Sequence, residues 1–185
     1  MGKGLVDKLQ GEFNITTEWM PLEIHPETPK EGKLIKDALP HVPIDGMKSQ
    51  LNMAGKPYNI TFGDFDRLSN TKDALIISEF AKDKGQFECF HTRLFEAYFV
   101  EGLDIGNLDI LKRLGEECNL NASEMESALT NPKYAKIIEE TNEEARKLGA
   151  TGTPTFIINN KYRVVGAQPY ENFVEILKKI QNNEV

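Results

Sequence analysis

Gly149-Ala150-Thr151-Gly152-Thr153-Pro154-Thr155-Phe156-Ile157-Ile158 runs from a helix end, through glycines, into a β-branched strand. The strand begins at Pro154, where a proline removes no ladder hydrogen bond from the sheet. A Thr-Pro peptide bond in a tight turn of this kind can be held in the cis form. We therefore predict a site formed by backbone groups, with Gly152, Thr153 and Pro154 as its candidate substrate-binding residues.

The residues after this stretch predict a β-hairpin and a closing helix. Residues 155–158 and 162–165 are β-branched or aromatic runs, and the Asn159-Asn160-Lys161 between them suits a tight turn, because Asn tolerates left-handed backbone angles. Pro169 is a typical first residue of a helix. Apolar residues then recur at helical spacing, at Phe173, Ile176, Leu177 and Ile180.

The beginning of the chain predicts a helix, a strand and a long loop. Leu5, Leu9 and Phe13 recur at helical spacing. Residues 17–24 alternate as a strand does, although Pro21 favours an edge position. Prolines interrupt every period between residues 25 and 43, which predicts an ordered loop with short helical turns.

The middle of the chain predicts a block of helices. A short helix is expected over residues 44–54 and another after Asn70-Thr71, and a strongly aromatic stripe at helical spacing follows from Phe87 to Phe99. Three asparagines mark the starts of later helices, because Asn is a preferred N-cap residue. They are Asn107, Asn121 and Asn131.

Composition limits the class of protein. The chain has 185 residues, 39% of them hydrophobic, which suits one compact domain. A net charge of -7 disfavours nucleic acid as a partner. No stretch approaches the roughly 18 apolar residues of a membrane span, and the first residues lack the apolar core of a signal peptide, so we expect a cytoplasmic protein.

The residues that could carry redox or metal chemistry are few. Cys89 and Cys118 lie 29 positions apart in helical patterns, with apolar neighbours, and we interpret both as buried free thiols without a redox role. His25, His41 and His91 have no metal-ligand spacing. We therefore expect no metal and no other cofactor.

Several motifs resemble the FrnE-like branch of the DsbA family. The segment Glu18-Trp19-Met20-Pro21-Leu22-Glu23-Ile24-His25-Pro26 resembles the second strand of that branch, and Phe95 to Ile105 resembles its insertion helix and following loop. Gly166-Ala167-Gln168-Pro169 is similar to the family's link between last strand and last helix. The resemblance implies an α/β, thioredoxin-like fold with a large all-helical insertion. It assigns residues 1–24 and 149–185 to an incomplete thioredoxin-like domain and 25–148 to the connecting loop and insertion.

The resemblance also indicates what these residues lack. The family begins with a strand that leads into Cys-Pro-x-Cys and then Gly-Lys, and Gly2-Lys3 is similar to that Gly-Lys. The first strand and both catalytic cysteines are therefore absent, so no catalytic residue is assigned. We expect a start codon placed at an internal Met, with a truncated gene as the alternative. The strands expected at 17–24 and 155–158 would each lose a partner.

Three functions follow from the resemblance. The first is a thiol-disulfide oxidoreductase, inactive as written, whose partners would be protein or small-molecule thiols and disulfides. The second is a glutathione-dependent isomerase of the hydroxychromene-carboxylate type, although Gln168-Pro169-Tyr170 stands where those isomerases usually carry an acidic-basic pair. The third is a non-catalytic module that binds extended peptides by backbone pairing. A homodimer is a further possibility, because another copy could fill the gap in the sheet.

Overall fold

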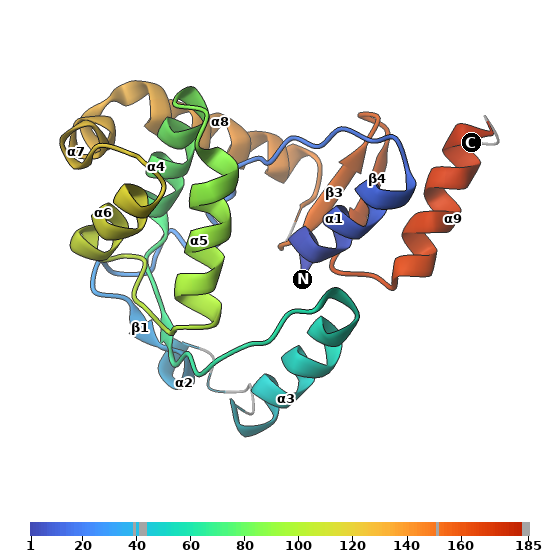
Figure 1. Cartoon of the computed structure of the whole chain (residues 1–185), viewed down its shortest axis with the longest axis horizontal. Helices are drawn as coiled ribbons and strands as arrows, with labels where there is room; N and C mark the ends of the chain where they lie inside the picture. Colours follow the sequence, from blue (N-terminus) through green and yellow to red (C-terminus); the bar gives the residue numbers. More distant parts are fainter. Residues whose placement is uncertain (39, 41–43, 151, 183–185) are drawn as a thin grey trace.

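The computed structural model describes residues 1–38, 40, 44–150 and 152–182 (Figure 1). Its strands form two separate antiparallel pairs, β1 (Lys33–Leu34) with β2 (Arg67–Leu68) and β3 (Thr155–Ile158) with β4 (Tyr162–Val165). Helices make up most of the rest. They are α1 (Gly2–Glu12), α2 (Ile35–Ala38), α3 (Ile44–Gly55), the short 3-10 helix η1 (Lys56–Tyr58), α4 (Lys72–Asp83), α5 (Phe87–Phe99), α6 (Leu108–Glu117), α7 (Ala122–Thr130), α8 (Pro132–Lys147) and α9 (Tyr170–Gln181).

Helices α4 to α8 pack around a continuous apolar core, which we call the helical block. The apolar residues that recur at helical spacing supply its buried side chains, and Phe90 and Leu111 are fully buried. Aromatic side chains meet edge to face in it, as Phe80 and Tyr134 do with ring centroids 6.2 Å apart. The predicted block of helices is therefore confirmed.

Asparagine side chains fix where three helices of the block begin. Asn107 Oδ1 accepts hydrogen bonds from the amides of Asp109 and Ile110, and Asn121 Oδ1 accepts from those of Ser123 and Glu124. Asn131 caps α8 in the same way. These bonds satisfy amides that have no partner within the helix, which is why the helices begin where the sequence predicts.

The second unit consists of α1, the β3–β4 hairpin and α9, and we call it the hairpin unit. Asn159 and Asn160 both have left-handed backbone angles in the turn, with φ of 53° and 54°, as the sequence predicts. Leu5 and Leu9 of α1 pack with Phe173 of α9. Only these three residues form its fully buried cluster within the described part of the chain.

The expected strand at residues 17–24 is wrong. The segment belongs to no ladder, and individual side chains hold its backbone. Lys82 Nζ donates to the Trp19 carbonyl at 2.5 Å, and Asn142 Oδ1 accepts from the Glu23 amide at 3.0 Å. A strand needs a neighbour for its backbone groups, and no described segment supplies one here.

One smaller feature also differs from what the sequence predicts. The regions predicted as loops contain the two-residue ladder of β1 with β2, in which Lys33 lies opposite Leu68 and Leu34 opposite Arg67. Strands this short carry no detectable alternation, so the sequence pattern could not reveal them. None of the described helices is long and apolar enough to span a membrane.

Candidate functional site

Pro154 lies against the first turn of α1. The Thr153–Pro154 peptide bond is cis in the structure. A Cβ atom added to Gly2 would come within 2.9 Å of Pro154 Cβ, so a side chain at that position would push the helix away from the proline. The start of α1 and the beginning of β3 are therefore in direct contact, as the resemblance to a redox fold requires.

One edge of β3 has no partner. The Gly166 amide donates to the Pro154 carbonyl at 2.8 Å, which fixes this pair as a hydrogen-bonded pair of the ladder with β4. Bonded and non-bonded pairs alternate in an antiparallel ladder, so the backbone groups of Thr155 and Ile157 point to the opposite edge. None of the described residues hydrogen-bonds these groups. We call this edge the open edge of β3.

The loop that leads into the open edge is ordered by one local bond. Thr155 Oγ1 donates to the Gly152 carbonyl at 2.7 Å. Thr153 is exposed, and a Cβ added to Gly152 would meet no atom within 4 Å. The three predicted site residues thus form one backbone segment, with Thr153 exposed and its two neighbours half-buried, that continues into the open edge.

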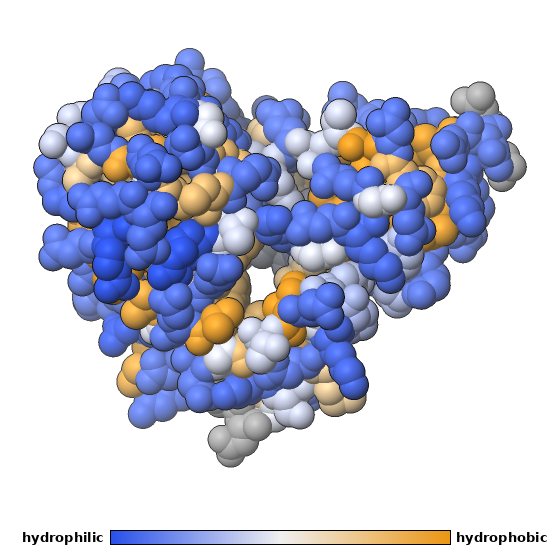
Figure 2. Space-filling view, in the orientation of Figure 1, coloured by the Kyte–Doolittle hydropathy of each residue, from blue (hydrophilic) through white to orange (hydrophobic). Residues whose placement is uncertain are grey.

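An aromatic cluster on α5 lies near the start of α1. His91 stacks on Phe87 with ring centroids 4.9 Å apart, and it contacts Phe95 at 4.5 Å and Trp19 at 4.8 Å. Phe87, His91 and Phe95 are four residues apart, so they share one face of the helix. Figure 2 shows the surface hollowed between the helical block and the hairpin unit.

Burial, together with the positive charges of Lys3 and Lys82, lowers the pKa of His91 from 6.5 to about 4. His91 is therefore neutral at pH 7. Its Nδ1 atom is buried and has no hydrogen-bond partner among the described residues. Lys3 follows Gly2 on α1, so its effect on the His91 pKa indicates that the aromatic cluster and the Pro154 contact face a common region.

The sequence analysis did not identify His91 as part of the site. The sequence predicted no metal-ligand role for His91, and it predicted a strand around Trp19. The i, i+4, i+8 spacing of Phe87, His91 and Phe95 was the available signal, but the approach of α1 depends on tertiary packing. His41, the third histidine considered for a metal site, lies outside the described residues.

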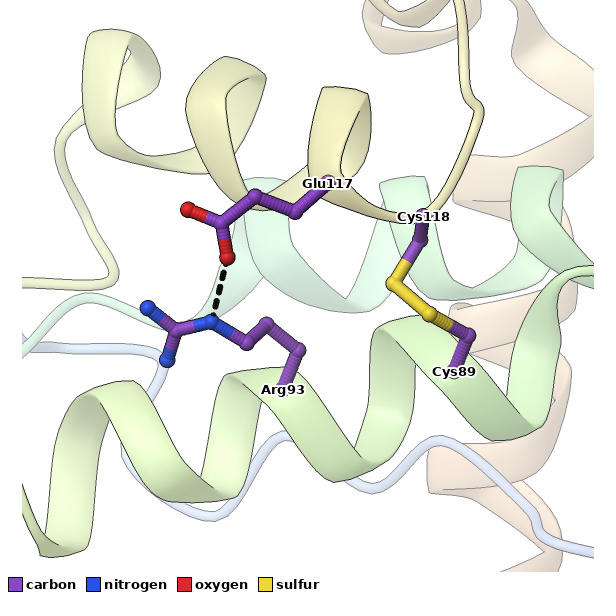
Figure 3. The surroundings of a disulfide bond; sticks show 4 residues. All are labelled: Cys89, Arg93, Glu117 and Cys118. Atoms are coloured by element: carbon purple, nitrogen blue, oxygen red, sulfur yellow. Dashed lines mark hydrogen bonds and ion pairs between the residues drawn. A yellow bond between two sulfur atoms is a disulfide. The ribbon is translucent and has the colours of Figure 1, made fainter.

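The interpretation of the cysteines as buried free thiols is wrong. Cys89 and Cys118 form a disulfide between α5 and the end of α6 (Figure 3). Cys89 is exposed, whereas Cys118 is 1% exposed. The apolar neighbours of Cys89 in sequence misled the prediction, because Phe90 is buried in the core and Phe87 stacks on His91, whereas Cys89 is exposed and bonded to Cys118.

These elements define a thioredoxin-like fold with a helical insertion. The N-terminal helix packs against a proline at a strand start, the hairpin is followed by a helix, and the helical block lies between them in sequence. The sequence profile described as "DSBA-like thioredoxin domain" matches residues 1–178. The chain therefore belongs to the DsbA-like thioredoxin-domain family.

Individual proteins resemble the chain over most of its length. The uncharacterized protein YwbO of Bacillus subtilis (strain 168) is 27% identical over 165 residues, which are 86% of this chain and 80% of that protein. A structure described as a probable DsbA oxidoreductase from Streptomyces coelicolor superposes with a TM-score of 0.88 at 22% identity, covering 98% of this chain and 83% of the other. A 2-hydroxychromene-2-carboxylate isomerase gives a TM-score of 0.72 at 15% identity, covering 97% and 86%. At these identities the two structures establish the fold.

Proposed function

We propose that the chain is a FrnE-like member of the DsbA class and binds protein or small-molecule thiols and disulfides in extended form along the open edge of β3. The observation that carries the proposal is the segment from Gly152 to Pro154, exposed at Thr153, which leads into unpaired backbone groups beside the start of α1. Main-chain pairing to a free strand edge gives affinity without demanding a particular side-chain sequence. That is suitable for an enzyme class that acts on many cysteine-containing segments.

Chemistry in this class needs a cysteine thiolate at the start of the helix, where the helix dipole stabilises it. The two cysteines of these 185 residues are Cys89 and Cys118, and both belong to the helical block. We therefore propose that these residues bind substrate at the open edge but do not exchange disulfides there. The catalytic step would need a thiol near Gly2 that the printed sequence does not contain.

Binding of a cysteine-blocked peptide tests this proposal. The probe is fluorescein-labelled insulin B chain with carboxymethylated cysteines, whose binding is followed by fluorescence anisotropy. Ile157→Pro removes an outward amide from the open edge without removing a bond to β4. It should weaken binding about fivefold or more, because a lost hydrogen bond contributes roughly 1 kcal/mol and the proline ring adds a clash.

Val165→Pro is the matched control. Val165 is 38% exposed and Ile157 is 39% exposed, and the Val165 amide points to the far edge of the hairpin. The control should bind within about twofold of the unchanged chain. Equal weakening by both variants, or no binding by the unchanged chain, would refute the proposed docking edge.

Activity assays separate the alternatives. We expect the chain not to accelerate the reduction of insulin by dithiothreitol, and not to isomerise 2-hydroxychromene-2-carboxylate in the presence of glutathione. Turnover in the second assay would favour the isomerase. Peptide binding without either turnover is the result that the proposal requires.

We further propose that the protein works in the cytoplasm and that a second copy can compete for the open edge. An unpaired strand edge is a template for another strand, including one from an identical chain. Sedimentation velocity over a range of concentrations should therefore detect self-association that Ile157→Pro weakens and Val165→Pro does not. Fractionation of the source cells tests the location.

A further inference from the structure

The disulfide of Cys89 with Cys118 is remote from the open edge of β3, and its two sulfur atoms lie in different environments. Cys89 is in the first turn of α5 and is exposed. Cys118 follows the last residue of α6 and is 1% exposed, within the core of the helical block. Cys89 is therefore the residue of the pair that solvent reaches, whereas the packed core surrounds Cys118.

The helix positions of the two residues reinforce this asymmetry. The first amides of α5 have no partner within the helix, and no side chain caps it, so its first turn favours negative charge at Cys89. The end of α6 disfavours negative charge, and burial disfavours it further at Cys118. These positions favour Cys89 over Cys118 as the sulfur that exchanges with a thiol.

An arginine holds the two helices together beside the disulfide (Figure 3). Arg93 Nε donates to Glu117 Oε2 at 2.5 Å, and Arg93 Nη1 lies 2.8 Å from Glu101 Oε1. The contact with Glu117 crosses from α5 to the end of α6, one helical turn from Cys89, whereas Glu101 lies in the segment that follows α5. The buried core of the block also connects these helices, so both sulfur atoms stay near each other when their bond is broken.

We propose that Cys89 and Cys118 form a reversible thiol-exchange site for a small thiol of the glutathione class. The thiolate of the small molecule attacks Cys89 Sγ, the bond to Cys118 breaks, and its electron pair leaves on Cys118 Sγ, which takes a proton from water. A second small thiolate attacks the added sulfur and releases Cys89 as a thiolate with a small-molecule disulfide. Two thiols are oxidised for each protein disulfide reduced, and the reverse sequence closes the bond.

The inference rests on the proposed function in one respect, because the proposed cytoplasmic location determines whether this disulfide is expected to open and close. Disulfides are rare in the cytoplasm of most organisms, where those that form are usually transient and catalytic or redox-sensing. A bond with one exposed sulfur and a preserved helix contact suits that behaviour. The reaction itself is a property of the isolated protein and can be measured whatever the compartment.

Two single-cysteine variants test the assigned site of attack. The folded variants Cys118→Ala, which keeps Cys89, and Cys89→Ala, which keeps Cys118, are each incubated with oxidised glutathione. Adduct formation is followed by the mass of the intact protein. We expect an adduct on Cys89 to form about 100-fold faster than one on Cys118, because protection by a buried core is of that order or larger. Equal rates would overturn the assignment of Cys89 as the reactive sulfur.

The unchanged chain tests reversibility. Reduced glutathione should open the bond under native conditions, with the trapped intermediate carrying glutathione on Cys89, and oxidised glutathione should close it again. Opening only in denaturing urea would overturn the proposal and leave a purely structural cross-link. The peptide assay uses blocked cysteines, so the two proposals are tested independently. A disulfide that does not open leaves the open-edge proposal standing, and a peptide that does not bind leaves the thiol-exchange proposal standing.

Two arginine variants test the role of the cross-helix contact. Arg93→Gln should reduce the equilibrium constant for closing the disulfide about two- to fivefold, the range expected for a partly exposed ion pair. Arg113→Gln is the matched control, because Arg113 lies 3.9 Å from the same carboxylate of Glu117 but on the same helix. An equal effect of both variants would overturn the proposed preorganisation by Arg93.

Discussion

The helical block and the hairpin unit differ in how completely each is packed. Among the described residues, the block has a cluster of 17 buried hydrophobic residues, whereas the hairpin unit has three. In the hairpin unit, Phe156, Val174 and Leu177 pack against those three but remain partly exposed. Figure 2 shows apolar surface over the hairpin and α9. The helical block therefore has a fully packed core, whereas the elements of the hairpin unit leave apolar side chains partly exposed.

The open edge of β3 explains this difference. A two-stranded hairpin is at most marginally stable alone and needs further strands or helices across its faces. Here α1 and α9 cover one face, while Ile157 and Val165 on the other are more than one third exposed. Among the described residues, only β4 pairs with β3, which leaves both the edge and the helices around it incompletely covered.

The largest expected contrast comes from truncating one phenylalanine in each core. Phe90 and Phe173 are 0% and 1% exposed. Phe90→Ala should lower the free energy of unfolding of the helical block by about 3–5 kcal/mol, measured by urea titration with far-UV circular dichroism. Phe173→Ala should leave that transition in place and lower an earlier one, because the hairpin unit opens separately.

Native-state hydrogen exchange provides the check on this contrast. Phe173→Ala should speed exchange in β3, β4 and α9 while leaving the amides of α4 and α5 protected. If both variants shift one common transition by the same amount, the two regions unfold together and the contrast drawn here is wrong.

The next effect concerns close packing inside the block. A Cβ added to Gly115 would lie 2.4 Å from Sδ and 2.5 Å from Cε of the fully buried Met125. Gly115→Ala should therefore destabilise the block by about 1–3 kcal/mol through overpacking. Gly11→Ala in α1 is the control, because an added Cβ there meets nothing within 4 Å. The control should stabilise the chain by about 0.5–1 kcal/mol, and thermal unfolding distinguishes the two signs.

A smaller effect depends on pH and concerns the surface where the two regions meet. The native pKa of His91 is about 4 and its ordinary value is 6.5, so the unfolded chain binds a proton between these values while the native chain does not. Stability should therefore fall as the pH is lowered from about 6.5 towards 4. Allowing for partial exposure, we expect a loss of about 1–2 kcal/mol.

His91→Phe isolates this contribution, because it keeps the aromatic contacts and removes the titrating group. Urea titrations at pH 7 and pH 5 should show a smaller loss for His91→Phe than for the unchanged chain. His25→Gln is the control at an exposed histidine, and it should keep the full loss. A loss unchanged in His91→Phe would assign the pH dependence to other groups.

The sequence could predict the features that depend on interactions between neighbouring residues. Helix starts at Asn107 and Asn121, and the Asn159-Asn160 turn, depend on residues that bond to their own neighbours, so they were predictable. The strand at 17–24 depends on a partner that these residues do not supply, and the alternation in sequence could not show that it would remain unpaired. The disulfide of Cys89 with Cys118 depends on the packing of α5 against α6, which no spacing in the sequence encodes.

The smallest effect concerns helix starts, where the two regions differ again. Three of the five helices of the block are capped by asparagine side chains, while α4 and α5 are not, and neither α1 nor α9 has a side-chain cap. Asn121→Ala should cost about 1 kcal/mol, because the amides of Ser123 and Glu124 lose their acceptor. Asn121→Asp keeps an acceptor oxygen and should lie within a few tenths of a kcal/mol of the unchanged chain. If Asn121→Ala unfolds at the same urea concentration as Asn121→Asp, the caps contribute nothing to the stability of the block, and packing alone accounts for the difference between the regions.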